Sequence, residues 1–404
     1  MSRYIVILGS LDTKGPEVDF IRQRVLAEGG VPLVIDTGVL NEATIPADIT
    51  RQEVAAAGGS TLQAIVEKGD KAQALVVMAA GAAHFALDLL AQDKLGGVLS
   101  IGGSRGTALS TRVMQSLPVG VPKLMVSTIA SGFNPFGPYV GTKDVMMMHS
   151  VADIQGINAV TRSIFSNAAT AITAMGKNGG PIMRSNKPTF AASILGVSTS
   201  LISQIQTLMD PEKTDVIAFH AIGTGGRAME ELIEQNLFDG VFDVTPSEVL
   251  QDIVQSSCSA GPNRLKAAGQ LGLPQVVATG GIDFIIEGAL ENLPACYRDR
   301  KIMRHTPMIT LVRTSAEEMR ILAQTMSERL AESKGPAAVI LPLQAFGWFS
   351  MEGSPLHDPE SDQAFIDSIK KYLNPRIELI ELNTHLNDPL VAETAVKFIK
   401  THLK

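Results

Sequence analysis

Residues 4–35 read YIVILGSLDTKGPEVDFIRQRVLAEGGVPLVI, and this stretch decides which fold we expect. It opens with a short apolar run, continues through a helix-like segment at residues 17–28, and reaches a second apolar run at residues 32–35 after two glycines. Continuous apolar runs that alternate with helical segments are typical of parallel strands covered on both faces. The stretch therefore predicts a strand, a helix and a second strand parallel to the first.

The same alternation continues along the rest of the chain. Apolar runs that we interpret as further strands are residues 74–78, 97–101, 123–126, 190–195, 216–220, 240–244, 276–278, 309–312, 338–341 and 377–381. Helical stretches such as residues 316–331 lie between them. The pattern predicts an α/β protein with two Rossmann-like, doubly wound domains, mostly parallel sheets and a cleft between the domains.

A stretch rich in Gly, Pro, Asn and Ser, residues 176–188, interrupts this alternation near the middle of the chain. We interpret it as a linker that separates a first domain, residues 1–180, from a second, residues 181–404. The run at residues 145–175 is expected to be the helix that closes the first domain. Its methionines and alanines predict an apolar surface, and with it a homodimer or a higher homo-oligomer.

Composition excludes several classes of protein. A net charge of −7 and 5% aromatic residues argue against a nucleic-acid partner. Two cysteines make neither a disulfide framework nor a four-thiolate zinc site. No targeting segment is recognised, and we interpret residues 72–90 as a strand, a turn and a helix and not as a membrane span. The expected location is the cytoplasm, without a membrane partner.

The loop GSLDTKG at residues 9–15 joins the first predicted strand to its helix, where open α/β sheets bind ligands. Its backbone amides, hydroxyls and ammonium group suit a phosphate, and Asp12 is the candidate ligand for Mg²⁺. The groups expected to bind nucleotide here are Gly9, Ser10, Asp12, Thr13 and Lys14. The alternative is a capped helix start, with Asp12 or Thr13 as the N-cap and Pro16 in the first turn. The spacing of a P-loop is absent.

A second glycine-rich loop follows the predicted strand at residues 97–101. Its glycines allow a ligand to approach the backbone closely, and its hydroxyls add hydrogen-bond donors. The end of the strand at residues 123–126 is expected at the same edge of the sheet. The nucleotide-binding groups predicted from these two segments are Gly102, Gly103, Ser104, Gly106, Thr107, Ser127 and Thr128.

The loop HAIGTGGRA at residues 220–228 has two interpretations. As G-x-G-x-x-A it fits a dinucleotide fingerprint, although Asp243 lies inside an apolar run and not at the end of one. As an anion-accepting turn it predicts a second site for a small anionic ligand, formed by Thr224, Gly225, Gly226, Arg227 and Thr245. The acid–base groups expected to act on such a ligand are His220, Glu248 and His305.

The ordered motifs of the chain resemble a known family. The motifs are GSLDTK (9–14), IGGSRGT (101–107), HAIGTGGRAME (220–230), SAGPNR (259–264), LVRT (311–314), DPE (358–360) and HLNDP (385–389). Together they resemble the ATP-binding region of the tomato mosaic virus resistance protein family and its bacterial relatives. The resemblance implies two Rossmann-like subdomains, dimerisation, and ATP with Mg²⁺ at the strand ends of the first domain. The segment ELN at residues 381–383 departs from the more acidic pattern of the relatives.

Three functions compete at this point. The first is a Mg²⁺-dependent ATP-binding protein that acts as an enzyme on a small anionic or phosphorylated metabolite in the cleft between the domains. The second is a non-catalytic module whose association is regulated by nucleotide. The third is an NAD(P)-dependent oxidoreductase that uses the residue 220–228 loop. No recognisable catalytic dyad is present, so the sequence leaves open whether the protein is an enzyme.

Overall fold

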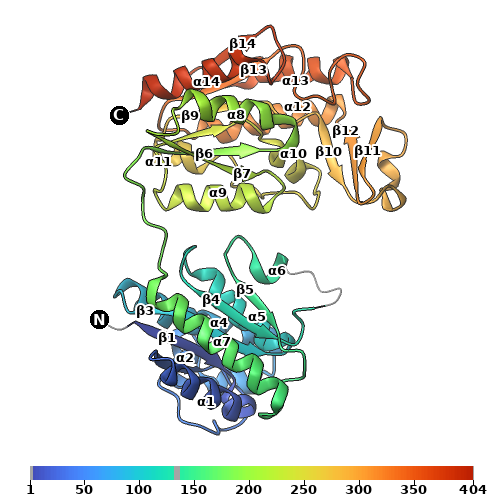
Figure 1. The fold of residues 1–404 in the computed structure, drawn as a ribbon. Coiled ribbons are helices and arrows are strands. Elements are labelled where there is room, and N and C mark those ends of the chain that lie inside the picture. Colours follow the sequence, from blue (N-terminus) through green and yellow to red (C-terminus); the bar gives the residue numbers. More distant parts are fainter. Residues whose placement is uncertain (1–2, 132–136, 404) are drawn as a thin grey trace. The chain divides into compact units, whose positions relative to one another are not determined.

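The computed structural model describes residues 3–131 and 137–403 and divides into two compact units, Met1–Ile182 (unit 1) and Met183–Lys404 (unit 2) (Figure 1). Each unit has its own hydrophobic core and its own mostly parallel sheet covered by helices on both faces. The predicted fold class, an α/β protein with two doubly wound sheets, is confirmed.

Unit 1 contains a five-stranded parallel sheet, sheet A, in the order β2-β1-β3-β4-β5. Its strands are β1 (Tyr4–Gly9), β2 (Val31–Asp36), β3 (Leu95–Gly102), β4 (Lys123–Ser127) and β5 (Met146–His149). Its helices are α1 (Leu11–Ala27), α2 (Arg51–Ala57), α3 (Leu62–Lys68), α4 (Lys71–Ala91), α5 (Ser104–Ser116), α6 (Gly137–Val140) and α7 (Ala159–Asn178). Side chains alternate along β1, so Ile5 and Ile7 pack against α1 and α7, and Val6 and Leu8 pack toward α2, α4 and α5.

The prediction of a strand at residues 74–78, and of a strand, turn and helix over residues 72–90, is wrong. The whole stretch is one helix, α4, whose first amides donate to the Asp70 side chain. A short apolar run does not distinguish a strand from a buried helix by its periodicity, and the alanines of this run favour helix. Gly81 lies in mid-helix because α2 passes close by: a Cβ there would lie 1.8 Å from the Val54 carbonyl oxygen.

Helix α4 is also the one helix of the described residues that is long and apolar enough to cross a membrane by length and composition. Of its most apolar window, 28% is buried inside the structure.

The single helix predicted at residues 145–175 is also wrong. Residues 146–149 form β5, which pairs with β4 at the edge of sheet A, and α7 begins only at Ala159. Asn158 starts α7 by accepting hydrogen bonds from the amides of Val160 and Thr161. The apolar surface that we expected on one long helix is therefore divided between a strand and a shorter helix. Self-association stays a prediction.

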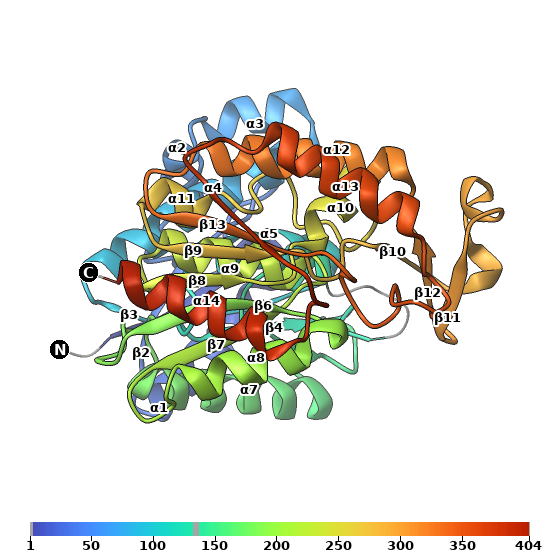
Figure 2. The same ribbon diagram turned by 90° about the horizontal axis from the view of Figure 1, so that it is seen from above.

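Unit 2 contains a six-stranded parallel sheet, sheet B, in the order β14-β13-β9-β8-β6-β7 (Figures 1 and 2). Its strands are β6 (Thr189–Ile194), β7 (Asp215–His220), β8 (Gly240–Asp243), β9 (Gln275–Ala278), β13 (Ala337–Pro342) and β14 (Glu378–Leu382). Helices α8 (Thr199–Leu208) and α14 (Pro389–His402) cover one face. The other face is covered by α9 (Thr224–Glu234), α10 (Ser247–Ile253), α11 (Ala267–Leu271), α12 (Ala316–Ala331) and α13 (Pro359–Tyr372).

Residues 309–312 do not join this parallel sheet, as we had expected. They belong to β12 (Ile309–Arg313), the central strand of a three-stranded antiparallel sheet between β10 (Phe284–Glu287) and β11 (Ile302–Thr306). Only Pro307 and Met308 separate β11 from β12, and a connection this short joins antiparallel strands. The predicted acid–base residue His305 therefore lies on a hairpin strand and not at the end of a parallel strand.

Both parallel sheets reverse their strand order at one point. In sheet A the point lies between β1 and β3, and in sheet B it lies between β6 and β8. In open α/β sheets, ligands bind in the crevice at the carboxyl ends of the strands that flank such a point. The topology therefore directs attention to the loops that follow β1 and β3 in unit 1, and β6 and β8 in unit 2.

Candidate functional site

A cavity of about 270 Å³ lies at the carboxyl ends of β1 and β3 in unit 1, where the topology places a ligand. We call it the switch-point pocket. It is lined by Ser10, Asp12, Thr13, Lys14, Thr37, Val39, Leu40, Lys71, Ala74, Leu75, Met78, Ile101, Gly102, Gly103, Arg105, Gly106 and Leu109. Both glycine-containing loops that the sequence singled out in the first domain contribute to this one pocket.

The loop after β1 forms the first polar wall of the pocket. Helix α1 begins at Leu11, but Lys14 has non-helical dihedral angles (φ −128°, ψ 17°), so the first turn is distorted. The Lys14 ammonium donates a hydrogen bond to the Ile154 carbonyl oxygen. Asp12 Oδ2 accepts hydrogen bonds from the amides of Leu40 (3.1 Å) and Asn41 (3.3 Å), which holds the loop after β2 against the pocket.

Asp36, at the end of β2, binds backbone amides of the loops after β1 and β2. One of its oxygens accepts hydrogen bonds from the amides of Leu11 (3.1 Å) and Gly38 (2.8 Å). Burial raises the pKa of this carboxyl, while the two amide hydrogen bonds act in the opposite direction. Asp36 therefore fixes the loops after β1 and β2 relative to each other and leaves Thr37 to line the pocket.

The loop after β3 forms the second polar wall. Gly103 is the N-cap of α5 and no side chain caps this helix end, so the pocket faces a helix N-terminus, which favours anions. Gly103 and Gly106 also leave room: a Cβ at either position has no neighbour closer than 3.5 Å. Both positions line the pocket and have space for a Cβ atom.

Some residues predicted to bind nucleotide lie outside the lining of the pocket. Thr107 Oγ1 and Ser127 Oγ are fully buried and share a hydrogen bond of 2.6 Å, which ties α5 to the end of β4. The predicted residues that are absent from the lining are Gly9, Ser104, Thr107, Ser127 and Thr128. Thr107 and Ser127 therefore support the second wall and do not face a ligand in this conformation.

The sequence did not predict the part of the pocket that α4 and the loop after β2 form, and the α4 residues were missed because a strand was expected there. Helix α4 contributes Lys71 and three apolar side chains, and the loop after β2 contributes Thr37, Val39 and Leu40. The lining therefore combines three cations, Lys14, Lys71 and Arg105, with the apolar side chains of α4 and of the loop after β2. A helical reading of the alanine-rich stretch after Asp70 would have found the α4 residues. No local sequence pattern marks the loop after β2 as part of the pocket.

In unit 2, the turn that was predicted to accept a small anion already holds a carboxylate of the protein. Glu248 Oε1 accepts hydrogen bonds from the amides of Gly223 (2.6 Å) and Gly226 (3.0 Å) at the start of α9. A Cβ at Gly226 would lie 1.8 Å from Glu248 Oε2, so this glycine is required for the contact. This corrects the prediction of an anion site at Thr224, Gly225, Gly226 and Arg227, because the Gly226 amide already binds Glu248.

Glu248 belongs to a buried ionic cluster centred on Arg264. The Arg264 guanidinium, fully buried, contacts Glu248 (2.7 Å), Glu230 (3.2 Å) and both oxygens of Asp243. Burial raises the pKa of Glu230 and of Glu248, and the nearby Arg264 charge opposes this rise. Asp243 ends β8, contrary to our expectation, and it is buried with both of its oxygens accepting hydrogen bonds from Arg264.

The remaining residues predicted for the second site do not form a catalytic set with Glu248. His220 and Arg227 are exposed, and the exposed His305 packs its ring against Phe349, with centroids 5.9 Å apart. Thr245 is buried and its Oγ1 hydrogen-bonds with Ser198 Oγ at 2.6 Å. Across the described residues, no hydrogen bond or ion pair joins His220, Glu248 and His305.

A second acidic group of unit 2 predicts a pH effect on stability. Burial raises the pKa of Asp362 from 3.8 to about 6, although its carboxylate pairs with Arg313 (2.5 Å). Because the folded protein binds this proton more tightly, the Asp362 contribution to stability is largest below pH 4 and falls as the pH rises toward 6. We expect Asp362→Asn to remove about 2–3 kcal/mol of this pH dependence.

The measurement is the free energy of unfolding by denaturant from pH 4 to pH 7. Asp367→Asn, which changes an exposed carboxylate on the same helix, is the matched control and should keep the wild-type profile. Identical pH profiles for wild type and Asp362→Asn would contradict the prediction.

Comparison with known proteins identifies the family. The N-terminal domain of the uncharacterised protein family UPF0261 matches residues 3–180, and its C-terminal domain matches residues 187–403. The chain belongs to the UPF0261 family. A UPF0261 protein of Clostridium tetani is 38% identical over 389 residues, which cover 96% of each chain.

The resemblance to the tomato virus resistance protein is also confirmed. The ToMV resistance protein Tm-1(GCR237) of Solanum lycopersicum is 31% identical over 312 residues, which are 76% of the UPF0261 chain and 41% of the tomato protein. Among solved structures, the spinosyn rhamnosyltransferase SpnG with thymidine diphosphate aligns over 98% of this chain and 95% of its own. Its TM-score is 0.17 at 13% identity, too low to carry an argument.

Proposed function

We propose that this UPF0261 protein binds ATP, together with Mg²⁺, in the switch-point pocket of unit 1. The observation that carries the proposal is the mixed lining of the pocket, with cations and apolar side chains, at the topological switch point. An apolar side suits a base, and a polar side with a helix N-terminus suits phosphates. The family resemblance of the GSLDTK and IGGSRGT motifs points to the same ligand.

Each wall has a separate role in this proposal. The apolar side chains Val39, Leu75 and Met78 would pack against the base. The open amides at the start of α5 and the cations Lys14 and Arg105 would bind the phosphates, because charge-assisted hydrogen bonds to phosphate are the stronger kind. Lys14 has two further N–H groups beside the one that it donates to Ile154.

The residues of the pocket fit a Mg²⁺ ion only when it binds together with the phosphates of the nucleotide. Asp12 is the one carboxylate among the residues that line the pocket, and the described part of the chain has no group of three or more potential metal-ligating side chains. Mg²⁺ usually binds through one or two carboxylates and the substrate phosphates, and it retains several waters. Asp12 would hold the ion directly or through water, and the ion would neutralise phosphate charge.

The proposal is for binding and leaves the reaction unassigned. The pocket contains no histidine or paired carboxylates that would act as an acid–base set. In unit 2, Glu248 is bound to backbone amides and to Arg264, which does not favour acid–base chemistry at the turn. Asp243 is bound to Arg264, which does not favour an NAD(P) site. A nucleotide-regulated module and an enzyme whose substrate binds elsewhere both agree with this pocket.

A thermal unfolding series tests the proposal. Ligand at a hundredfold excess over its Kd stabilises a protein by about 2.7 kcal/mol, so saturating Mg-ATP should raise the unfolding temperature by several degrees. Mg²⁺ alone and adenosine alone should do less, because each would contact one side of the pocket. No shift at any Mg-ATP concentration would contradict the proposal.

A further inference from the structure

The apolar side chains that line the switch-point pocket differ in how they are packed. Most of them belong to the hydrophobic clusters of unit 1, and these are Val39, Ala74, Leu75, Met78, Ile101 and Leu109. Leu40 is the exception, because it is 71% exposed and belongs to none of the clusters formed by the described residues of unit 1. An exposed apolar side chain gains free energy when a ligand covers it. The Leu40 side chain therefore has apolar surface available to a ligand.

Leu40 lies on the loop that follows β2, residues 37–44, which we call the lid loop. Both ends of this loop are bonded to residues that flank the loop after β1. The Thr37 amide donates a hydrogen bond to the Gly9 carbonyl oxygen (2.8 Å), and the Thr44 amide donates one to the Leu11 carbonyl oxygen (3.0 Å). Because its ends are fixed in this way, the position of Leu40 depends on the bonds made by the middle of the lid loop.

The middle of the lid loop is held from two elements. Asp12 Oδ2, on α1, accepts hydrogen bonds from the amides of Leu40 (3.1 Å) and Asn41 (3.3 Å). On α2, the buried Arg51 donates to the Asn41 carbonyl oxygen and pairs with Glu42 (2.5 Å). Of these two groups, Asp12 is the one that binds the backbone of Leu40 itself. Hydrogen bonds from amides to a carboxylate are of the stronger, charge-assisted kind.

A role in capping α1 does not account for Asp12. The N-cap of α1 is Ser10, and the Asp12 carboxylate binds amides of the lid loop and not those of its own helix. The lid loop also approaches Asp12 closely, because a Cβ at Gly38 would lie 3.0 Å from Asp12 Oδ1. A glycine at this position lets the loop lie against the carboxylate.

We propose that Leu40 contacts the base of the bound nucleotide and that Asp12 is the positioning residue that holds Leu40 there. Both roles rest on the proposed binding of nucleotide in the switch-point pocket. They add to the role of Asp12 toward Mg²⁺, because the hydrogen bonds to the lid loop are made by Oδ2. Loss of Asp12 therefore affects nucleotide binding even without the metal ion.

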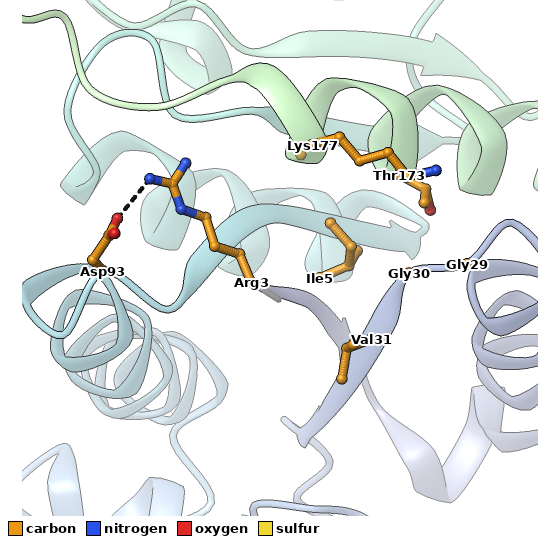
Figure 3. Close-up of a pocket in the computed structure, with 9 residues that line it drawn as sticks. Arg3, Ile5, Gly29, Gly30, Val31, Asp93, Thr173 and Lys177 are labelled. Carbon is orange, nitrogen blue, oxygen red and sulfur yellow. Dashed lines mark hydrogen bonds and ion pairs between the residues drawn. The ribbon is translucent and has the colours of Figure 1, made fainter. Parts of the chain in front are cut away.

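A second cavity of unit 1, of about 410 Å³, provides a control for the location of the ligand (Figure 3). It lies where β1 and β2 begin, and the switch-point pocket lies where strands of the same parallel sheet end. Its lining includes Lys177 and the ion pair between Arg3 and Asp93 (2.6 Å). Lys177→Met removes a cation here and should leave the affinity for nucleotide unchanged.

The test is a calorimetric titration of the full chain with ATP in the presence of EDTA and, separately, with Mg-ATP. The variants are Leu40→Ala, Asp12→Ala and Asp12→Asn, whose amide oxygen still accepts hydrogen bonds. Leu26→Ala, which shortens a leucine that is 49% exposed on α1, is the matched control for Leu40→Ala. Hydrogen exchange of the Leu40 and Asn41 amides, measured without nucleotide, reports on the lid loop itself.

We expect Leu40→Ala to weaken both ATP and Mg-ATP binding by roughly tenfold, because part of the apolar contact is removed. Asp12→Ala should weaken the binding of ATP in EDTA and speed exchange of the two amides. Removal of a negative charge from a phosphate site by itself favours ATP, so weaker binding reports on the lid loop. Asp12→Asn should resemble the wild type in EDTA and in exchange, and lose affinity only for Mg-ATP.

The outcomes separate this proposal from nucleotide binding as such. If the wild type binds ATP and Leu40→Ala binds it equally well, the contact with Leu40 is excluded while nucleotide binding stands. If Asp12→Ala loses affinity only in the presence of Mg²⁺, Asp12 is a metal ligand alone and its positioning role is excluded. A similar loss in Leu26→Ala or Lys177→Met would also overturn the proposal. Absence of binding to the wild type would contradict the proposed function together with it.

Discussion

Arg264→Met should destabilise unit 2 by about 3–5 kcal/mol, the cost of removing one partner from a buried ion cluster. The guanidinium is fully buried and contacts Asp243, Glu230 and Glu248, so its loss leaves three carboxylates without a counter-charge. The effect extends to the start of α9, because Glu248 also binds the amides of Gly223 and Gly226. We expect a loss of this size in the free energy of unfolding by denaturant.

Arg320→Met is the matched control, since Arg320 pairs with Glu317 on the exposed face of α12. Exposed pairs contribute about 0–1 kcal/mol, so this variant should unfold close to wild type. If Arg264→Met is insoluble, the milder Arg264→Lys variant, which keeps a charge but loses the fork of donors, replaces it in the unfolding measurement. Wild-type stability of Arg264→Met or Arg264→Lys would contradict the role that we assign to the cluster.

Gly103→Val should weaken Mg-ATP binding by roughly a hundredfold or more, about 2.7 kcal/mol, and leave the fold intact. Gly103 lines the switch-point pocket as the N-cap of α5, and a Cβ there meets only the Thr128 hydroxyl, at 3.7 Å. The added Cβ therefore has room in the fold, and because Gly103 lines the pocket we expect the Val side chain to obstruct a phosphate at the α5 amides. Calorimetric titration measures the change in affinity.

Gly288→Val is the control for this variant, because a Cβ at Gly288 has no neighbour within 4 Å and the residue lies in unit 2. Gly102 is unsuitable, since its Cβ would lie 2.9 Å from the Gly106 Cα and would disturb the backbone itself. Unchanged affinity in Gly103→Val, with the fold intact by thermal unfolding, would exclude the phosphate position that we propose.

The parts of the fold and site that the sequence predicts well depend on local patterns. The run at residues 4–8, the glycine loop that follows and the helix after it recur as β1, the distorted turn at Lys14 and α1. The loop at residues 102–106 likewise lies between a strand and a helix. Because the carboxyl ends of β1 and β3 are adjacent in the sheet, two loops far apart in sequence line one pocket.

The parts that the sequence does not predict depend on packing between distant segments. An apolar, alanine-rich run fits both a strand and a buried helix, so α4 and its contribution of Lys71 and Met78 to the pocket were missed. The turn at Gly225–Gly226 has the features of an anion site, and it does bind a carboxylate. No local feature shows that the carboxylate is Glu248, which Arg264 holds from a different loop.

The most direct test of nucleotide binding in unit 1 is a calorimetric titration of the full chain with Mg-ATP, repeated with Gly103→Val and Gly288→Val. We predict one binding site per chain with a Kd between about 1 µM and 1 mM, retained in Gly288→Val and lost or weakened roughly a hundredfold in Gly103→Val. Absence of binding heat in the wild type, together with absence of thermal stabilisation, would contradict the account. So would equal affinity in all three proteins.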